Sequence, residues 1–157
     1  MVNNKILKKM RWYLFFLGKF KIPMLGFSRV KLIDLNDDIA KVSIGLRRRT
    51  KNHLNSMYFG ALAVGADVAG GIHAFYYAEK MNKKISFAFK SMNAQFIKRA
   101  ESDCTFISND GKKVENAVLR SIKDNVRINE TTKVHVYDAS NELVAEFEME
   151  ISVKCLN

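Results

Sequence analysis

Residues 57–78 read MYFGALAVGADVAGGIHAFYYA, and this stretch decides the fold. Its length and its richness in Ala and Gly favour a buried helix over a strand. Each of its four glycines lowers helix propensity by about 1 kcal/mol relative to alanine, so close packing must supply the missing stability. We therefore expect a central helix that lies almost flush against a sheet wrapped around it.

The segments on either side of this helix predict a mainly antiparallel sheet and two further helices. Apolar residues at helical spacing indicate an amphipathic N-terminal helix within residues 1–22, which ends near Gly18. A short amphipathic helix is expected at residues 114–123. Strands are expected at 29–35, 40–46, 85–97, 104–108, 133–137 and 144–153. Because no linker interrupts the chain, we expect a single α+β domain over residues 1–157.

The basic side chains gather near the N-terminus. Residues 1–51 carry 13 of the 26 Lys and Arg but only 3 of the 16 Asp and Glu. Such a patch implies an anionic partner, which could be nucleic acid, a membrane surface or a phosphorylated small molecule. No nucleic-acid reader motif accompanies the charge, so we expect no nucleic-acid partner.

The N-terminal segment resembles a signal peptide in its charged stretch and the apolar run that follows. Lys19 and Lys21 interrupt that run, and no small-residue cleavage site follows, which favours a cytoplasmic protein.

Cys104 and Cys155 have no metal-ligand spacing, so both are expected to be reduced thiols. The three histidines are too scattered to predict a metal site.

Asp67 lies in the middle of the central helix and carries the only formal charge between Asn52 and Ala78. Burying an unpartnered carboxylate costs several kcal/mol, so Asp67 must be hydrogen-bonded, have a raised pKa or face a cleft. These conditions suit a catalytic acid or base. Two alternatives are a structural aspartate bonded inside the core and a transmembrane span over 57–78, and the cost of inserting Asp67 disfavours the span.

The sequence NHLNSMYFG at residues 52–60, followed by ALAVGA and Asp67, resembles a known signature. The family is the hotdog-fold acyl-CoA thioesterases of the 4-hydroxybenzoyl-CoA thioesterase superfamily, and the phenylacetic-acid-degradation type is the most similar. In that signature an Asn precedes the helix, a His-Gly-Gly starts it, and an acid follows seven residues after the second Gly. Asn52, Gly60 and Asp67 are in register, whereas Tyr58 and Phe59 replace the His and the first Gly.

The resemblance extends to residues 96–100, FIKRA, where Arg99 replaces a family proline. It implies a hotdog fold over residues 28–154, with an antiparallel sheet wrapped around the central helix. It also implies an acyl-CoA thioesterase that needs no cofactor beyond the CoA of its substrate. The family's sites are shared between subunits, which implies a homodimer or a tetramer built from dimers.

The family's catalytic roles fall on three matching positions. Asp67 would be the general base or nucleophile, Asn52 would orient the water or the substrate carbonyl, and the Gly60 N–H would polarise that carbonyl. The departures at Tyr58 and Phe59 leave an alternative function open beside the thioesterase. This alternative is a non-catalytic hotdog protein that binds an acyl ligand or an anionic membrane surface.

Six further residues are candidates for substrate contact: Ser56, Tyr58, Phe59, Arg49, Lys98 and Arg99. Arg49 belongs to the basic run 47–51, for which capture of the CoA phosphates and a solvated loop are both open. Ser56 is also the expected N-cap of the central helix. The N-terminal helix carries more aromatic residues than one packed stripe requires, so we expect it to cover part of the acyl tunnel or to touch a membrane surface.

Overall fold

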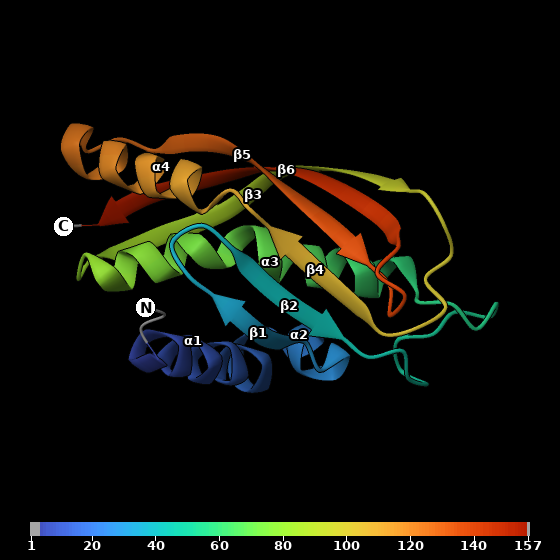
Figure 1. Cartoon of the computed structure of the whole chain (residues 1–157). Helices are drawn as coiled ribbons and strands as arrows, with labels where there is room; N and C mark the ends of the chain where they lie inside the picture. The colour runs from blue at the N-terminus through green and yellow to red at the C-terminus, as the bar shows by residue number, and fades with distance from the viewer. Residues whose placement is uncertain (1–3, 157) are drawn as a thin grey trace.

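In the computed structural model, which describes residues 4–156, a six-stranded antiparallel sheet wraps around one long helix (Figure 1). The order of strands in the sheet is β1-β2-β4-β5-β6-β3. The strands are β1 (Lys31–Leu35), β2 (Ala40–Ile44), β3 (Lys84–Phe96), β4 (Cys104–Ser108), β5 (Ile128–Tyr137) and β6 (Leu143–Leu156). The helices are α1 (Asn4–Phe16), α2 (Pro23–Ser28), α3 (Phe59–Lys80) and α4 (Gly111–Asp124), with a π-helical turn at Leu17–Lys21. This arrangement confirms the predicted hotdog fold.

The glycines of α3 allow the helix to lie against the sheet. A Cβ atom at Gly65 would lie 2.3 Å from the ring of Phe106 on β4, and one at Gly70 would lie 2.4 Å from the terminal carbon of Met149 on β6. An alanine at Gly65 would clash with the Phe106 ring, and an alanine at Gly70 would force the end of the Met149 side chain to move. The close packing predicted from the sequence is therefore confirmed.

Among the described residues α3 is long and apolar enough to cross a membrane, but 67% of its apolar window is buried inside the fold, as in a core helix.

The element order agrees with the prediction, and several boundaries do not. The expected N-cap role of Ser56 is wrong, because α3 begins after Tyr58, which makes no side-chain capping bond. The helix α2 and the π-helical turn were not predicted. They form because the chain doubles back where Gly18 meets Gly26, an approach so close that a Cβ at Gly18 would lie 2.8 Å from the Gly26 nitrogen. Cys104 and Cys155 are free thiols, as expected, and both are buried.

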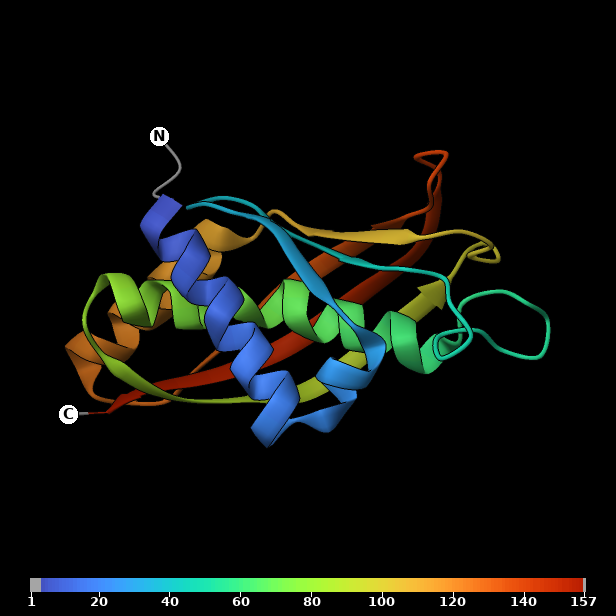
Figure 2. The same cartoon turned by 90° about the horizontal axis from the view of Figure 1, so that it is seen from below.

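The N-terminal segment, residues 4–28, covers the side of α3 that the sheet leaves open (Figure 2). Its inner face buries Leu7, Met10 and Leu14 in the core. Arg11 attaches α1 to β1 by donating hydrogen bonds to the carbonyl oxygens of Leu32 and Ile33, at 2.9 and 2.7 Å. The segment is thus packed on the fold along its length, and only residues 1–3 of the predicted N-terminal helix lie outside the described part of the chain.

Candidate active site

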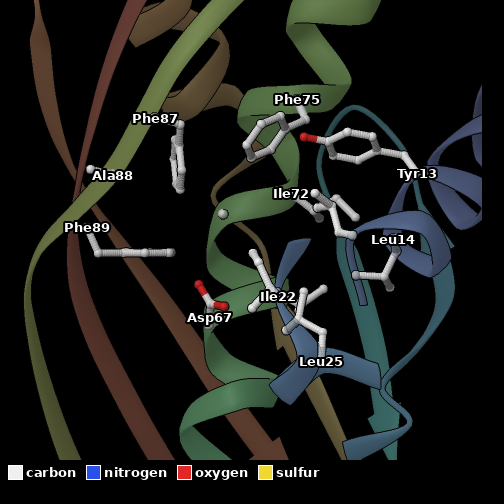
Figure 3. Close-up of a pocket in the computed structure, with 13 residues that line it drawn as sticks. Tyr13, Leu14, Ile22, Leu25, Asp67, Ile72, Phe75, Phe87, Ala88 and Phe89 are labelled. Carbon is white, nitrogen blue, oxygen red and sulfur yellow. The ribbon is translucent and has the colours of Figure 1, made fainter. Parts of the chain in front are cut away.

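A pocket of about 280 Å³ lies between the N-terminal segment, α3 and β3 (Figure 3). Its walls are almost entirely apolar: Leu14, Leu17, Ile22, Leu25, Val68, Gly71, Ile72, Phe75, Phe87, Ala88 and Phe89. Asp67 and Tyr13 are the two lining residues with a polar side-chain group. The carboxyl group of Asp67 points into this apolar space in Figure 3. A cavity of this kind suits a hydrocarbon ligand with one reactive polar end.

Burial raises the pKa of Asp67 from 3.8 to about 6. Loss of hydration is the sole cause, because no hydrogen bond or nearby cation offsets it. A carboxyl group with this pKa is still ionised at pH 7, by about ten to one, and it is a stronger base than an ordinary aspartate. The sequence offered three possible environments for Asp67, and the structure has two of them: a raised pKa and a position at a cleft. The carboxyl group is not hydrogen-bonded to any of the described residues.

Tyr13 is the polar wall residue that sequence reasoning missed. Its ring packs against Phe75 with 5.3 Å between centroids, and burial raises the pKa of its hydroxyl group. In the sequence Tyr13 shares the helical spacing of Met10 and Leu17, which indicates only a packing position on the helix. Only the tertiary contact with α3 shows that it faces the Asp67 pocket.

Asn52 holds the loop before α3 in shape. Its side-chain oxygen accepts hydrogen bonds from the backbone N–H groups of Leu54 and Ser56, at 2.9 and 3.1 Å. Its amide nitrogen donates to the Ser56 hydroxyl at 3.0 Å. Ser56 is buried by this arrangement. Within one chain Asn52 and Ser56 therefore hydrogen-bond to each other, and neither residue lines the Asp67 pocket.

Gly60 is the second residue of α3, so its N–H group belongs to the first turn, where backbone donors have no acceptor within the helix. The ring of Tyr58 lies directly against it, because a Cβ at Gly60 would be only 2.4 Å from that ring. Tyr58 and Phe59 are both exposed, and their rings pack together with centroids 4.7 Å apart. The start of α3 thus offers a backbone donor bordered by two aromatic rings.

Gly60 and Asp67 lie on nearly the same face of α3 but not within reach of one another. Seven residues at 1.5 Å each separate them by about 10 Å along the helix axis. A base and an oxyanion donor that act on one carbonyl must both lie about 3 Å from the reacting atoms. One chain therefore holds two separate halves of the site that the sequence predicts.

The candidate basic residues lie in two places. The Arg49 guanidinium stacks 5.2 Å from the centre of the Phe27 ring and lines a polar pocket of about 180 Å³ together with Arg29, Lys31 and Arg47. Arg47 is held there by Asp103 at 2.9 Å. At the other location Lys98 pairs with Glu142, and the neighbouring Arg99 is exposed. Within residues 4–156 no group of three or more His, Cys, Asp or Glu side chains is placed to hold a metal ion.

Comparison with known proteins identifies the fold and the family. The model of a family described as "Domain of unknown function (DUF4442)" matches residues 11–153. A Chlorobaculum tepidum protein of unknown function has a TM-score of 0.82 at 12% identity, covering 98% of this chain and 96% of that one. A Shewanella oneidensis protein with a provisional thioesterase assignment has a TM-score of 0.79 at 13% identity, covering 96% and 99%. A Haemophilus influenzae thioesterase has a TM-score of 0.69 at 12% identity, covering 96% and 91%. No curated protein sequence matches the chain.

Proposed function

The chain belongs to the DUF4442 family, and we propose that it is an acyl-CoA thioesterase that hydrolyses its substrate to a free acid and CoA. One observation carries the proposal: an unpaired carboxylate with a pKa of about 6 faces an apolar pocket large enough for part of an acyl chain. The thioesterase names of the Haemophilus influenzae and Shewanella oneidensis neighbours support it. Within the thioesterases, the Asn52–Asp67 motif favours the phenylacetic-acid-degradation type.

In this mechanism Asp67 removes a proton from the attacking water. The water oxygen then adds to the thioester carbonyl, and the negative charge that develops on the carbonyl oxygen is stabilised by the Gly60 N–H at the positive end of α3. When the tetrahedral intermediate collapses, the C–S bond breaks and CoA leaves as a thiolate, which takes up the proton held by Asp67 and so regenerates the carboxylate. Because a thiol has a pKa near 8.5, the leaving group needs little help from a general acid.

The proposed site requires two copies of the chain. Asp67 and Gly60 of one chain are about 10 Å apart, so Asp67 can act together with an oxyanion donor only if Gly60 of the partner subunit supplies it. The sheet has an edge suited to such pairing. Among the described residues, β3 pairs only with β6, and its other side is a free edge of 13 residues, whereas Arg11 covers the opposite edge at β1. Long free edges of this kind favour strand pairing between chains.

The CoA phosphates would bind at the polar pocket between α2 and β2. Arg29, Lys31 and Arg49 surround it, and Asp103, the acid at this pocket, is already paired with Arg47. Lys98 is a weaker candidate because Glu142 and Asp138 already neutralise it. The guanidinium group of arginine presents paired N–H donors whose spacing matches the oxygens of a phosphate group.

A non-catalytic acyl-binding protein is the second candidate, and the ring of Tyr58 favours it. The ring lies against Gly60, where a substrate carbonyl would have to approach the N–H. Releasing that donor requires the side chain to rotate, which its exposed position permits.

A panel of aliphatic and aromatic acyl-CoAs, assayed with a thiol reagent, separates the two candidates. The thioesterase predicts release of CoA that depends on enzyme concentration and that is lost in Asp67→Asn. Saturable binding of acyl-CoA without release of thiol by the wild-type protein would establish the binding function instead. The matched control is Asp124→Asn, which removes an exposed carboxyl at the end of α4 and should leave turnover unchanged.

A further inference from the structure

The outer face of the N-terminal segment exposes an unusual amount of large apolar surface. Seven such side chains within 16 consecutive residues are more than one third exposed, and the indole of Trp12 reaches 71%. They are Trp12, Phe15, Phe16, Phe20, Ile22, Met24 and Phe27. Apolar side chains exposed singly are ordinary, but a contiguous patch of this size marks an interaction surface.

The aromatic members of this surface are gathered together. Trp12 and Phe15 meet edge to face with centroids 5.9 Å apart, and the rings of Phe16 and Phe20 are 4.8 Å apart. The ammonium group of Lys19 lies 6.0 Å from the Phe15 ring and 5.4 Å from the Phe20 ring, which joins the two pairs. We call these four rings the aromatic patch. Figures 1 and 2 show that α1 and α2 lie on the side of α3 opposite the sheet, so their outer face points away from the rest of the fold.

The charged side chains of the N-terminal segment, residues 4–28, are all positive. Lys5, Lys8, Lys19 and Lys21 are exposed, and no acidic residue precedes Asp34. Lys9 is paired with Glu79 of α3 and does not add to the free charge. Exposed aromatic side chains among lysines, on a helix without acids, have the composition of helices that lie in a membrane interface. The complementary partner is a surface of anionic lipid headgroups.

We propose that the N-terminal segment docks this protein on an anionic lipid bilayer. The aromatic patch enters the boundary between headgroups and acyl chains, and the exposed lysines contact the lipid phosphates. Leu7, Met10 and Leu14 already hold α1 on the core, so docking requires no folding of the segment. A second copy of the chain is a poorer occupant of the same face, because contact between two such faces would bring their lysines together with no carboxylate on the segment to pair with them.

The docked orientation places the apolar pocket next to the bilayer. Ile22 belongs both to the exposed face and to the wall of the Asp67 pocket. An acyl chain leaving the membrane would therefore meet the pocket without crossing water. This consequence rests on the proposed thioesterase function, whereas the docking itself does not.

Sedimentation of the full chain with lipid vesicles tests the proposal directly. Vesicles of phosphatidylcholine alone are compared with vesicles that also contain phosphatidylglycerol, at low and at high salt. We expect binding to the anionic vesicles, at least about tenfold weaker binding to the neutral ones, and weakening with salt, because exposed charges are screened. A triple variant, Trp12→Ser, Phe15→Ser and Phe16→Ser, should bind at least about tenfold more weakly, because it removes most of the apolar area that enters the bilayer.

The charge and the fold are controlled separately. Lys8→Glu with Lys19→Glu should also lower binding to anionic vesicles by at least about tenfold, and should reduce its dependence on salt. The matched control is Leu119→Ser with Lys123→Glu, which makes the same kinds of change on exposed positions of α4. Unfolding curves should show every variant folded, since each replaced side chain is exposed.

Three results would overturn the proposal. The first is no binding of the wild-type chain to anionic vesicles. The second is equal binding by the wild-type chain and the serine triple variant. The third is a smaller particle mass of that triple variant in light scattering together with no vesicle binding by the wild-type chain, which would assign the aromatic patch to contact between protein chains. None of these readouts uses thioester hydrolysis, so failure of the proposed enzymatic function would leave the docking result intact.

Discussion

Replacing Asp67 by Asn should make the protein more stable at neutral pH while it stops catalysis. Burial raises the pKa of this carboxyl from 3.8 to about 6. Ionisation of Asp67 is therefore less favourable in the folded than in the unfolded protein, which lowers the free energy of unfolding at neutral pH. A difference of about 2 pKa units corresponds to about 3 kcal/mol at 1.36 kcal/mol per unit. Asparagine has a similar size and carries no charge, so it avoids that cost. For a chain of this length the midpoint of thermal unfolding should rise by about 6–12 °C.

The gain in stability should depend on pH in a definite direction. Because the folded pKa lies above the unfolded one, the wild-type protein loses stability as the pH rises from about 4 to about 6, and the loss is constant above that. The stabilisation by Asp67→Asn should therefore be complete at pH 8, shrink below pH 6 and vanish near pH 4. Chemical denaturation at pH 8, 6 and 4 measures this profile.

Turnover of the same purified variant supplies the second half of the test. Loss of a general base predicts a decrease in kcat of about 10²–10⁴-fold. Asp124→Asn should change the free energy of unfolding by less than about 0.5 kcal/mol and leave kcat unaltered. A structural aspartate would give the reverse pattern: a lower thermal midpoint at pH 8 with turnover largely intact. Either a destabilised Asp67→Asn protein or near-normal turnover would refute the reasoning from the pocket.

Three further outcomes are expected. If the proposed hydrolysis runs through Asp67, the kcat/KM of the wild-type protein should increase about tenfold per pH unit below pH 6 and level off above it, which a pH–rate profile measures. Gly71→Ala places a Cβ 3.0 Å from Phe89 and 3.1 Å from Phe87, so it should narrow the pocket and shift the preference in an acyl-CoA panel towards shorter chains; an unchanged preference would place the acyl chain elsewhere. Light scattering should give a mass of at least twice 18.0 kDa, and Met92→Lys on the free edge strand should lower it, whereas a wild-type monomer would contradict the shared site.

The features of the fold that the sequence predicted are those with a local or periodic signal. The glycines of the central helix predicted close packing, and Gly65 and Gly70 make it against β4 and β6. Apolar and polar residues alternate along β6, which is the pattern of a strand with one core face, and the apolar members are buried: Phe147, Met149, Ile151 and Val153. Ser152 occupies one of the alternate, polar positions, yet it is buried, and the Arg127 guanidinium donates hydrogen bonds to its hydroxyl and carbonyl oxygens. Arg127 lies in the connection just before β5, and the alternating pattern of β6 gives no indication that this distant side chain will cover Ser152.

The features that the sequence missed arise from contacts between distant residues. Nothing near Gly18 indicates that Gly26 will lie against it, so the turn back into α2 could not be predicted locally. The same holds for the pocket, whose wall joins Tyr13 of α1 to Phe75 of α3 and Phe87 of β3. Asp67 was found because its isolation on an apolar helix is visible in the sequence alone. Its apolar surroundings, and hence its pKa, required the fold.

The motif departures at the start of α3 follow from which way each position faces. The side chain of Phe59 points outward, 60% exposed, so replacing the glycine of the family signature there meets no steric barrier. Gly60 is different, because the Tyr58 ring in its present position occupies the space that a Cβ at Gly60 would need. The Phe59 ring also contacts Phe96 at the end of β3, with 6.5 Å between centroids, which extends exposed apolar surface from the helix start to the free sheet edge. The two substitutions thus preserve the backbone donor and add apolar area where a second subunit would have to bind for Asp67 and Gly60 to meet.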